Sequence, residues 1–137
     1  MANALEILKQ DHRTVEGLFT QFESSQERSV AEQICEELDT HTKIEEQIVY
    51  PVLRSDVSGG EGMAEHAEGE HAEARQLIGR IRQTKDDDHL AELVGQLKAA
   101  IEEHVSDEED EVFPKMEQAL EGSRLQEMGD EVESMKG

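Results

Sequence analysis

The sequence predicts an all-α protein: an up-down-up-down four-helix bundle followed by a short extra C-terminal helix. Apolar residues recur at steps of three and four through most of the 137 residues, which is the period of an amphipathic helix, and no stretch has the period of two that a strand needs. The pattern H-x-x-x-E-E-x-x-V-aromatic-P occurs twice, at 41–51 and at 104–114. Two similar helical hairpins in tandem, with short connections, favour the bundle.

The first expected helix spans about 3–23. Its apolar residues form one stripe along the helix, and His12 lies inside that stripe. A loop is expected at 24–28, before the next apolar stripe begins.

The second helix is expected to begin near Ser29, which has the spacing of a capping box with Glu32. It should run to about Tyr50, with His41 and Glu45 on its apolar stripe. Proline lacks the amide that continues a helical hydrogen-bond ladder, so the helix should end or kink near the proline that follows Tyr50.

The third helix is expected over about 63–84, after a loop at 55–62, and carries His71 on its buried stripe. The acids at 86–88 predict a turn that caps the fourth helix. The stripe of the fourth helix leads into the second copy of the repeated pattern, and this helix should bend or end near the proline of that copy.

A last, short helix is expected after Ser123, which has capping-box spacing with Gln126, and it should lie on the outside of the bundle. The sequence therefore divides into a bundle over 1–121 and a C-terminal helix or tail over 122–137.

Composition limits the classes of function. The net charge is −21, which argues against binding to nucleic-acid phosphate or to an anionic membrane and permits a basic protein partner. The single cysteine, Cys35, excludes an internal disulfide and is expected on the flank of the second helix. No apolar run approaches the roughly 18 residues that span a bilayer, and no secretory signal opens the chain. We therefore expect a soluble, cytoplasmic protein.

Six polar side chains fall on stripes that should be buried. A His and a Glu four residues apart lie on one helix face, about 40° apart around the axis. A buried carboxylate costs several kcal/mol unless a cation accompanies it. Mixed imidazole and carboxylate ligands suit iron, manganese or zinc, and six of them suit two metals bridged by the carboxylates and an oxo or hydroxo group. The predicted metal ligands are His12, His41, Glu45, His71, His104 and Glu108.

Three other polar residues have both a plain and a functional interpretation. His66 lies four residues before Glu70, but about 140° around the helix from His71, which favours a solvated face. Glu109 is a rival to the predicted ligand before it, although a supporting or surface acid is more typical there. Tyr50 either packs at the end of the bundle, or reaches the metal or donates a hydrogen bond to its surroundings.

These motifs resemble the hemerythrin-like, or HHE cation-binding, domain family. The resemblance rests on a lone His in the first and third helices and on H-x-x-x-E before an aromatic-Pro in the second and fourth. It implies a non-haem di-iron centre, with two iron ions bridged by an oxo or hydroxo group inside a four-helix bundle. Glu45 and Glu108 would bridge the irons, and the four histidines would fill terminal positions.

Two departures from the oxygen-carrying hemerythrins bear on function. Ala67 stands where those proteins have a further His, and Glu108 follows its His by four residues where they have an Asp at five. A lost His ligand leaves a second exchangeable position, which favours reaction with O2, H2O2 or NO over stable O2 carriage. As an enzyme, the protein would be a catalase-like or oxidase-like non-haem di-iron oxidoreductase. The alternatives are an oxygen, NO or iron sensor, a reversible O2 carrier, an iron store, and a purely structural acidic bundle.

Overall fold

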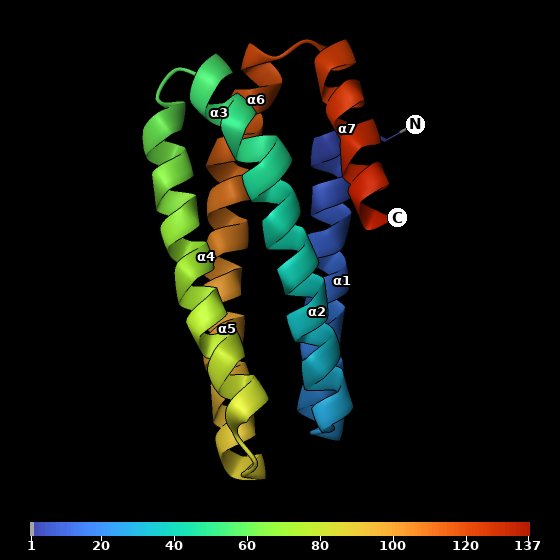
Figure 1. The fold of residues 1–137 in the computed structure, drawn as a ribbon, viewed down its shortest axis with the longest axis vertical. Helices are drawn as coiled ribbons and strands as arrows, with labels where there is room; N and C mark the ends of the chain where they lie inside the picture. The colour runs from blue at the N-terminus through green and yellow to red at the C-terminus, as the bar shows by residue number, and fades with distance from the viewer. Residues whose placement is uncertain (1) are drawn as a thin grey trace.

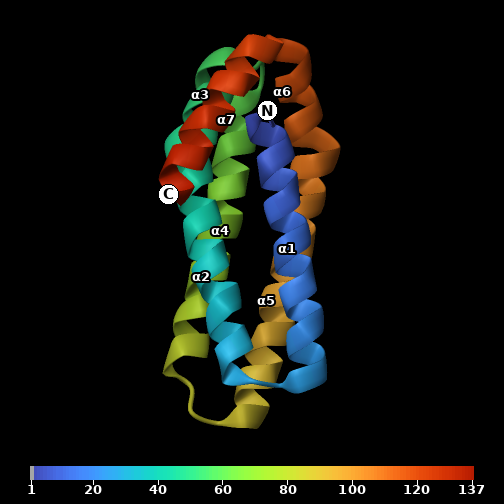
Figure 2. The same cartoon turned by 90° about the vertical axis from the view of Figure 1, so that its right-hand side faces the viewer.

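The computed structural model describes residues 2–137, and no strand occurs among them (Figures 1 and 2). The helical segments in chain order are α1 (Ala4–Ser25), α2 (Arg28–Ile44), η1 (Glu45–Val49), α3 (Tyr50–Asp56), α4 (Gly60–Gln83), α5 (Asp87–Asp107), η2 (Glu108–Val112), α6 (Phe113–Ala119) and α7 (Gly122–Lys136). The segments η1 and η2 are single turns of π-helix.

The four long helices pack in a ring. α1 contacts α2, α2 contacts α4, α4 contacts α5, and α5 returns to α1. Figure 1 shows them running along the long axis of the molecule, with α7 lying beside α1 at the end where both chain termini are found. This arrangement confirms the predicted up-down-up-down bundle with an extra C-terminal helix. No helix within 2–137 has both the length and the apolar character needed to cross a bilayer.

Local side-chain bonds begin two of the helices. Asn3 starts α1 with a capping box, since its Oδ1 accepts from the Glu6 amide at 3.0 Å and its own amide donates to Glu6 Oε1 at 2.9 Å. Asp86 starts α5 by accepting from the amides of Asp88 and His89. The second finding confirms the turn expected at the acidic run 86–88.

Two other expected caps are wrong, because neither Ser29 nor Ser123 caps a helix. α2 begins one residue earlier than expected, and the Arg28 guanidinium donates to the carbonyl oxygens of Ile81 and Thr84 at the end of α4. This contact between neighbouring helices fixes the start of α2, so the serine falls inside its first turn.

The helices do not end at Pro51 or Pro114. In η1 the amide of Tyr50 donates to the carbonyl of Glu45, five residues back, and η2 repeats this pattern. Each proline then lies in the first turn of the next α-helix, where its missing amide leaves no bond unmade. The chain therefore stays helical to Asp56, and the loop before α4 covers only 57–59 instead of the expected 55–62.

The buried apolar residues form two clusters. On α1, Leu8 belongs to the cluster near α3, α6 and α7, Val15 belongs to the cluster at the other end, and His12 lies between them. Cys35 is fully buried in the second cluster instead of lying on a helix flank, and burial raises the pKa of its thiol to about 11. The boundary between the two clusters is where the polar residues of the interior gather.

Candidate metal centre

The structure brings the six predicted ligands together at the boundary between the two apolar clusters. Each is at most 5% exposed. They form two groups of four, and within each group one ligand atom from every residue lies within 4.8 Å of the others. The first group is His12, His41, Glu45 and Glu108, and the second is Glu45, His71, His104 and Glu108. The groups share two glutamates, as a pair of bridged metals requires.

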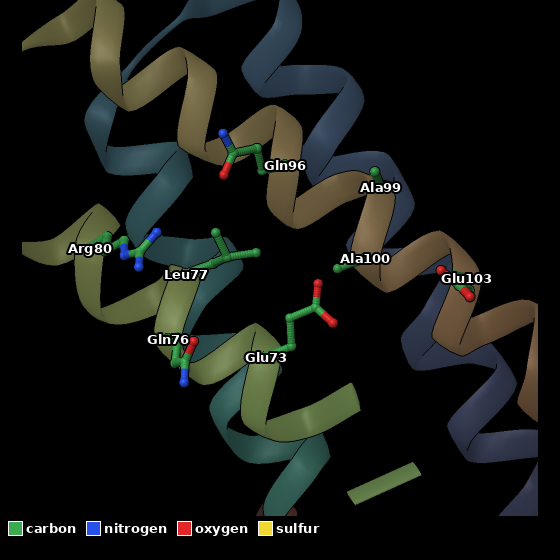
Figure 3. A pocket seen from close by; sticks show the side chains of 8 residues that line it. All are labelled: Glu73, Gln76, Leu77, Arg80, Gln96, Ala99, Ala100 and Glu103. Atoms are coloured by element: carbon green, nitrogen blue, oxygen red, sulfur yellow. The ribbon is translucent and has the colours of Figure 1, made fainter. Parts of the chain in front are cut away.

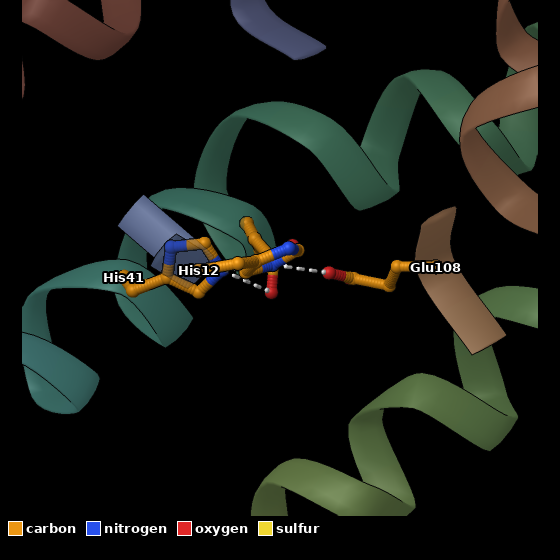
Figure 4. A group of neighbouring side chains, drawn as sticks. His12, His41 and Glu108 are labelled. Atoms are coloured by element: carbon orange, nitrogen blue, oxygen red, sulfur yellow. Dashed lines mark hydrogen bonds and ion pairs between the residues drawn. The ribbon is translucent and has the colours of Figure 1, made fainter. Parts of the chain in front are cut away.

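The first group joins α1, α2 and the two π turns. Figure 4 shows His12, His41 and Glu108 pointing toward one another. His12 Nε2 lies 3.2 Å from Glu108 Oε1 and 3.2 Å from His41 Nε2. His41 Nε2 lies 3.4 Å from Glu45 Oε1, the residue one turn further along the same helical run. Ligand atoms from four segments thus face one small volume.

The second group adds the histidines of α4 and α5. His71 Nε2 lies 3.1 Å from His104 Nε2 and 3.1 Å from Glu45 Oε1. His104 Nε2 lies 3.3 Å from Glu108 Oε2. Because Glu108 turns one oxygen to each group, its carboxylate has the placement of a bridge.

Every histidine of the centre donates its Nδ1–H to a carboxylate, and this bond fixes the tautomer that leaves Nε2 free to bind a metal. The pairs are His12 with Glu109 at 2.7 Å, His41 with Asp11 at 3.2 Å, His71 with Glu46 at 2.7 Å, and His104 with Glu70 at 2.8 Å. We call these four acids the supporting carboxylates. Burial opposes their ionisation, yet the bonds that they accept lower the pKa of all four.

The supporting carboxylates follow the internal repeat of the sequence. Asp11 precedes His12 and Glu70 precedes His71, and each holds the histidine of the other helix in its own hairpin. The acid after each predicted bridging glutamate holds a histidine of the opposite hairpin. Glu109 therefore supports His12 and does not join either group of ligands.

Tyr50 is the residue that makes the two halves of the centre different. It is fully buried, and its hydroxyl donates to Glu108 Oε2 at 2.7 Å, with His71 Nε2 at 3.1 Å. Burial and the nearby carboxylates raise the pKa of Tyr50, so it stays a phenol. The matching residue of the second repeat, Phe113, stacks on the His12 ring with centroids 6.0 Å apart. Tyr50 thus reaches the centre, as the functional interpretation of this residue expected, and does more than pack.

The unmet bonding capacity of the centre fits a pair of cations. Glu45 Oε2 is buried without a hydrogen-bond partner. Glu108 Oε1 also accepts no hydrogen bond, because its neighbour at 3.2 Å, His12 Nε2, belongs to a ring whose Nδ1–H donates to Glu109. Such oxygens are rare and costly for a carboxylate. When no metal is bound, a proton on His41 neutralises part of the carboxylate charge of the centre. Burial lowers the pKa of His41, but the charge of Glu45 and the bond to Asp11 raise it to about 10. The residues present therefore suit two metal ions bridged by carboxylates.

A cavity of about 270 Å³ reaches the centre between α4 and the start of η2. It runs from the exposed His66 past Ala67 and Glu70 to the buried Glu108. A second groove between α4 and α5, of about 490 Å³, contains Leu77 and is lined by none of the six predicted ligands (Figure 3). Of these two, only the first cavity is lined by a predicted ligand, and a much smaller cavity of about 10 Å³ lies beside His12, His41 and His104.

Comparisons with known proteins agree with this geometry. A family model described as the hemerythrin HHE cation binding domain matches residues 3–116. The crystal structure of a hemerythrin HHE cation binding domain-containing protein from Mycobacterium kansasii superimposes with a TM-score of 0.83 at 23% identity, over 99% of this chain and 86% of that one. A curated protein named DNA nickase, from a Nostoc species, is 27% identical over 98% of this chain, which spans only 39% of that relative. The chain belongs to the hemerythrin HHE cation-binding domain family, and its clustered histidines and glutamates are able to hold metal ions.

Proposed function

We propose that this chain is a non-haem di-iron protein that reacts with O2, peroxide or NO, and that it favours peroxide decomposition or oxidase-type chemistry over stable O2 carriage. One observation carries the proposal: the Nε2 atoms of four histidines and the carboxylates of two glutamates face one buried volume. His12, His41, His71 and His104 would be terminal ligands, and Glu45 and Glu108 would bridge.

A bound pair of iron ions supplies electron transfer and Lewis acidity to a small oxidant. The chain supplies the rest. The supporting carboxylates hold the imidazoles in one orientation, and the apolar clusters on either side keep bulk water out. The Tyr50 hydroxyl, 2.7 Å from Glu108, holds a proton beside the ligand atoms and is placed to donate it.

The cavity beside Ala67 supports turnover over stable carriage. A methyl group stands where the oxygen-carrying relatives have another imidazole, and the space left open extends to Glu108. Its volume of about 270 Å³ is ample for O2, peroxide or NO. A small molecule thus has both a path to the centre and room beside it.

Metal analysis combined with spectra tests the proposal. We expect two irons per chain and the absorption of an oxo-bridged pair in the oxidised protein, followed by peroxide consumption in proportion to iron at fixed pH. A chain that folds equally well after exhaustive chelation and never takes up iron would contradict the di-iron centre. A spectrum that changes reversibly with O2, without peroxide consumption, would show carriage instead of turnover.

A sensor is the second candidate, and one set of contacts favours it. Lys136, at the end of α7, pairs with Asp11, and Asp11 accepts the Nδ1–H of His41. A change at His41 would therefore be transmitted to a helix on the surface. Amide hydrogen exchange along α7 in reduced and oxidised protein tests this, and equal exchange in the two states would reject a sensor that signals through α7.

We propose no nicking activity for this chain, despite the name of its Nostoc relative. The match covers 39% of that protein, so most of the relative lies outside the compared region. A net charge of −21 also repels the phosphate backbone of DNA. Incubation with supercoiled plasmid tests this directly, and conversion of the plasmid to open circles would contradict it.

A further inference from the structure

A second group of metal-ligating side chains lies outside the buried centre, at the mouth of the cavity that leads to it. His66 on α4 places Nε2 3.3 Å from Asp107 Oδ2 and 3.5 Å from Glu70 Oε2. Ligand atoms of these three residues all lie within 4.8 Å of one another. His66 and Asp107 are 41 residues apart in sequence and meet because α4 packs on α5.

Glu70 connects this outer group to the centre. One of its oxygens, Oε2, faces His66, and the other, Oε1, accepts the Nδ1–H of His104 at 2.8 Å. The cavity of about 270 Å³ is lined by all three residues of the outer group and by Glu108, which is 1% exposed. The outer group and a predicted bridging carboxylate therefore line the same cavity.

The charge balance at Glu70 differs from that of the other supporting carboxylates. Asp11 pairs with Lys136, Glu46 pairs with Arg75 at 2.8 Å, and Glu109 pairs with Arg13. Within the described chain, Glu70 has no Lys or Arg at ion-pair distance. It faces instead His66 and a second carboxylate, Asp107. The one supporting carboxylate without a basic partner is thus the one that lines the cavity.

We propose that His66, Glu70 and Asp107 form a surface site for a divalent transition-metal ion, and that ions pass from it through the cavity to load the buried centre. The second part rests on the proposed function. One imidazole and two carboxylates suit Fe²⁺, Mn²⁺, Co²⁺ or Zn²⁺. Three protein ligands leave positions for water, so the ion is held loosely enough to move on. No lining residue of the cavity is Lys or Arg, and Glu111 adds a further acid, so the mouth concentrates cations.

Cobalt binding to metal-free protein tests the surface site. We expect His66→Ala and Asp107→Asn each to bind one Co²⁺ fewer per chain than the parent protein, measured by visible absorption and metal analysis after dialysis against dilute Co²⁺. His66 is 66% exposed, so its removal leaves the fold intact. His89→Ala, which removes an exposed histidine at the start of α5, is the matched control and should bind the parent number of ions.

The rate of loading tests the path. Ions that survive brief passage over a chelating resin are counted as buried, and we expect their uptake to slow at least about tenfold in Asp107→Asn, which removes one of the charges that concentrate cations at the mouth. The final buried count should match that of the parent. An unchanged ion count in both variants would overturn the surface site, and a lost surface ion with unchanged loading would overturn the path. If the buried centre took no ion at all, the surface ion would still be lost in His66→Ala, so the two proposals fail separately.

Discussion

At the scale of single residues, Tyr50 and Phe113 decide that the two halves of the centre are not equivalent. They hold the same place in the repeated pattern, but only Tyr50 carries a hydroxyl, and it lies 2.7 Å from Glu108 and 3.2 Å from Glu45. Phe113 covers the His12 ring with an apolar face. A proton donor is therefore available on the side of His71 and absent on the side of His12.

Replacing Tyr50 by Phe should remove this donor while keeping the shape of the interior. We expect Tyr50→Phe to bind the parent amount of iron but to consume peroxide about 100-fold or more slowly, in the range of a lost general acid, with a changed pH profile. Phe113→Leu, which leaves the phenol in place, is the control and should stay near the parent rate. Stopped-flow kinetics on iron-loaded protein make the comparison. A parent rate of peroxide consumption in Tyr50→Phe would show that the tyrosine takes no part in the reaction.

The metal-free centre makes stability depend on pH. The pKa of His41 is about 10 in the folded chain, against an ordinary value of 6.5, because Glu45 and Asp11 outweigh the effect of burial. A raised pKa contributes stability that is complete below pH 6.5 and is lost as the pH rises toward 10.

Urea unfolding of chelated protein should therefore show a free energy of unfolding that falls between about pH 6.5 and 10, by up to about 1.4 kcal/mol per pH unit for each histidine that releases its proton. Iron-loaded protein should lack this fall, because metal ions replace the protons. A flat or rising stability of the chelated protein over this interval would show that His41 is neutral in the fold.

At the scale of elements, the π turn η1 brings the Tyr50 side chain to the same side of the helix as Glu45. Residues five apart on an α-helix lie about 140° apart around the axis, so Glu45 and Tyr50 would face different sides. The wider turn of η1 brings the Tyr50 amide onto the Glu45 carbonyl, and the Tyr50 hydroxyl reaches the Glu45 carboxylate as well. Single π turns of this kind often accompany functional sites.

The junction of α3 and α4 depends on one glycine. A Cβ on Gly60 would lie 1.7 Å from the Leu53 carbonyl oxygen, whereas a Cβ on Gly69, in the same helix, would meet nothing within 4 Å. We expect Gly60→Ala to lower the free energy of unfolding by about 1–3 kcal/mol. Gly69→Ala should raise it by about 0.5–1 kcal/mol, because alanine favours a helix interior. Denaturant unfolding of both variants measures the two changes in the free energy of unfolding. Equal changes would show that the start of α4 does not lie against the Leu53 carbonyl of α3.

At the scale of the whole molecule, the interior consists of two apolar clusters separated by a layer of ionisable groups. The carboxylates of this layer keep buried oxygens that lack hydrogen-bond donors. A buried charge of this kind destabilises the fold unless a cation accompanies it, so the metal-free protein should be the less stable form.

Removal of metal should lower the thermal unfolding midpoint. An ion present at about 100 times its dissociation constant stabilises the fold by about 2.7 kcal/mol, and chelation removes this contribution. Thermal unfolding followed by circular dichroism, before and after exhaustive chelation, measures the change. Readdition of iron should restore the midpoint, and identical midpoints in all three samples would show that the ionisable layer is stable by itself.

The sequence by itself determined the helical period, the duplication and the six polar residues on buried stripes. All three depend on spacing along one chain, and the structure brings those six residues together. The cap signals of the sequence failed at Ser29 and Ser123. At Ser29, the packing of Arg28 against the end of α4 accompanies the earlier start of α2.

Only the tertiary structure decided which carboxylate holds which histidine, how Tyr50 reaches Glu108, and that His66 meets Asp107. The supporting bonds join residues from 25 to 97 positions apart. The repeat places each acid beside a motif, but which histidine the acid meets depends on how the four long helices pack and on the single extra residue that each π turn inserts into its helix.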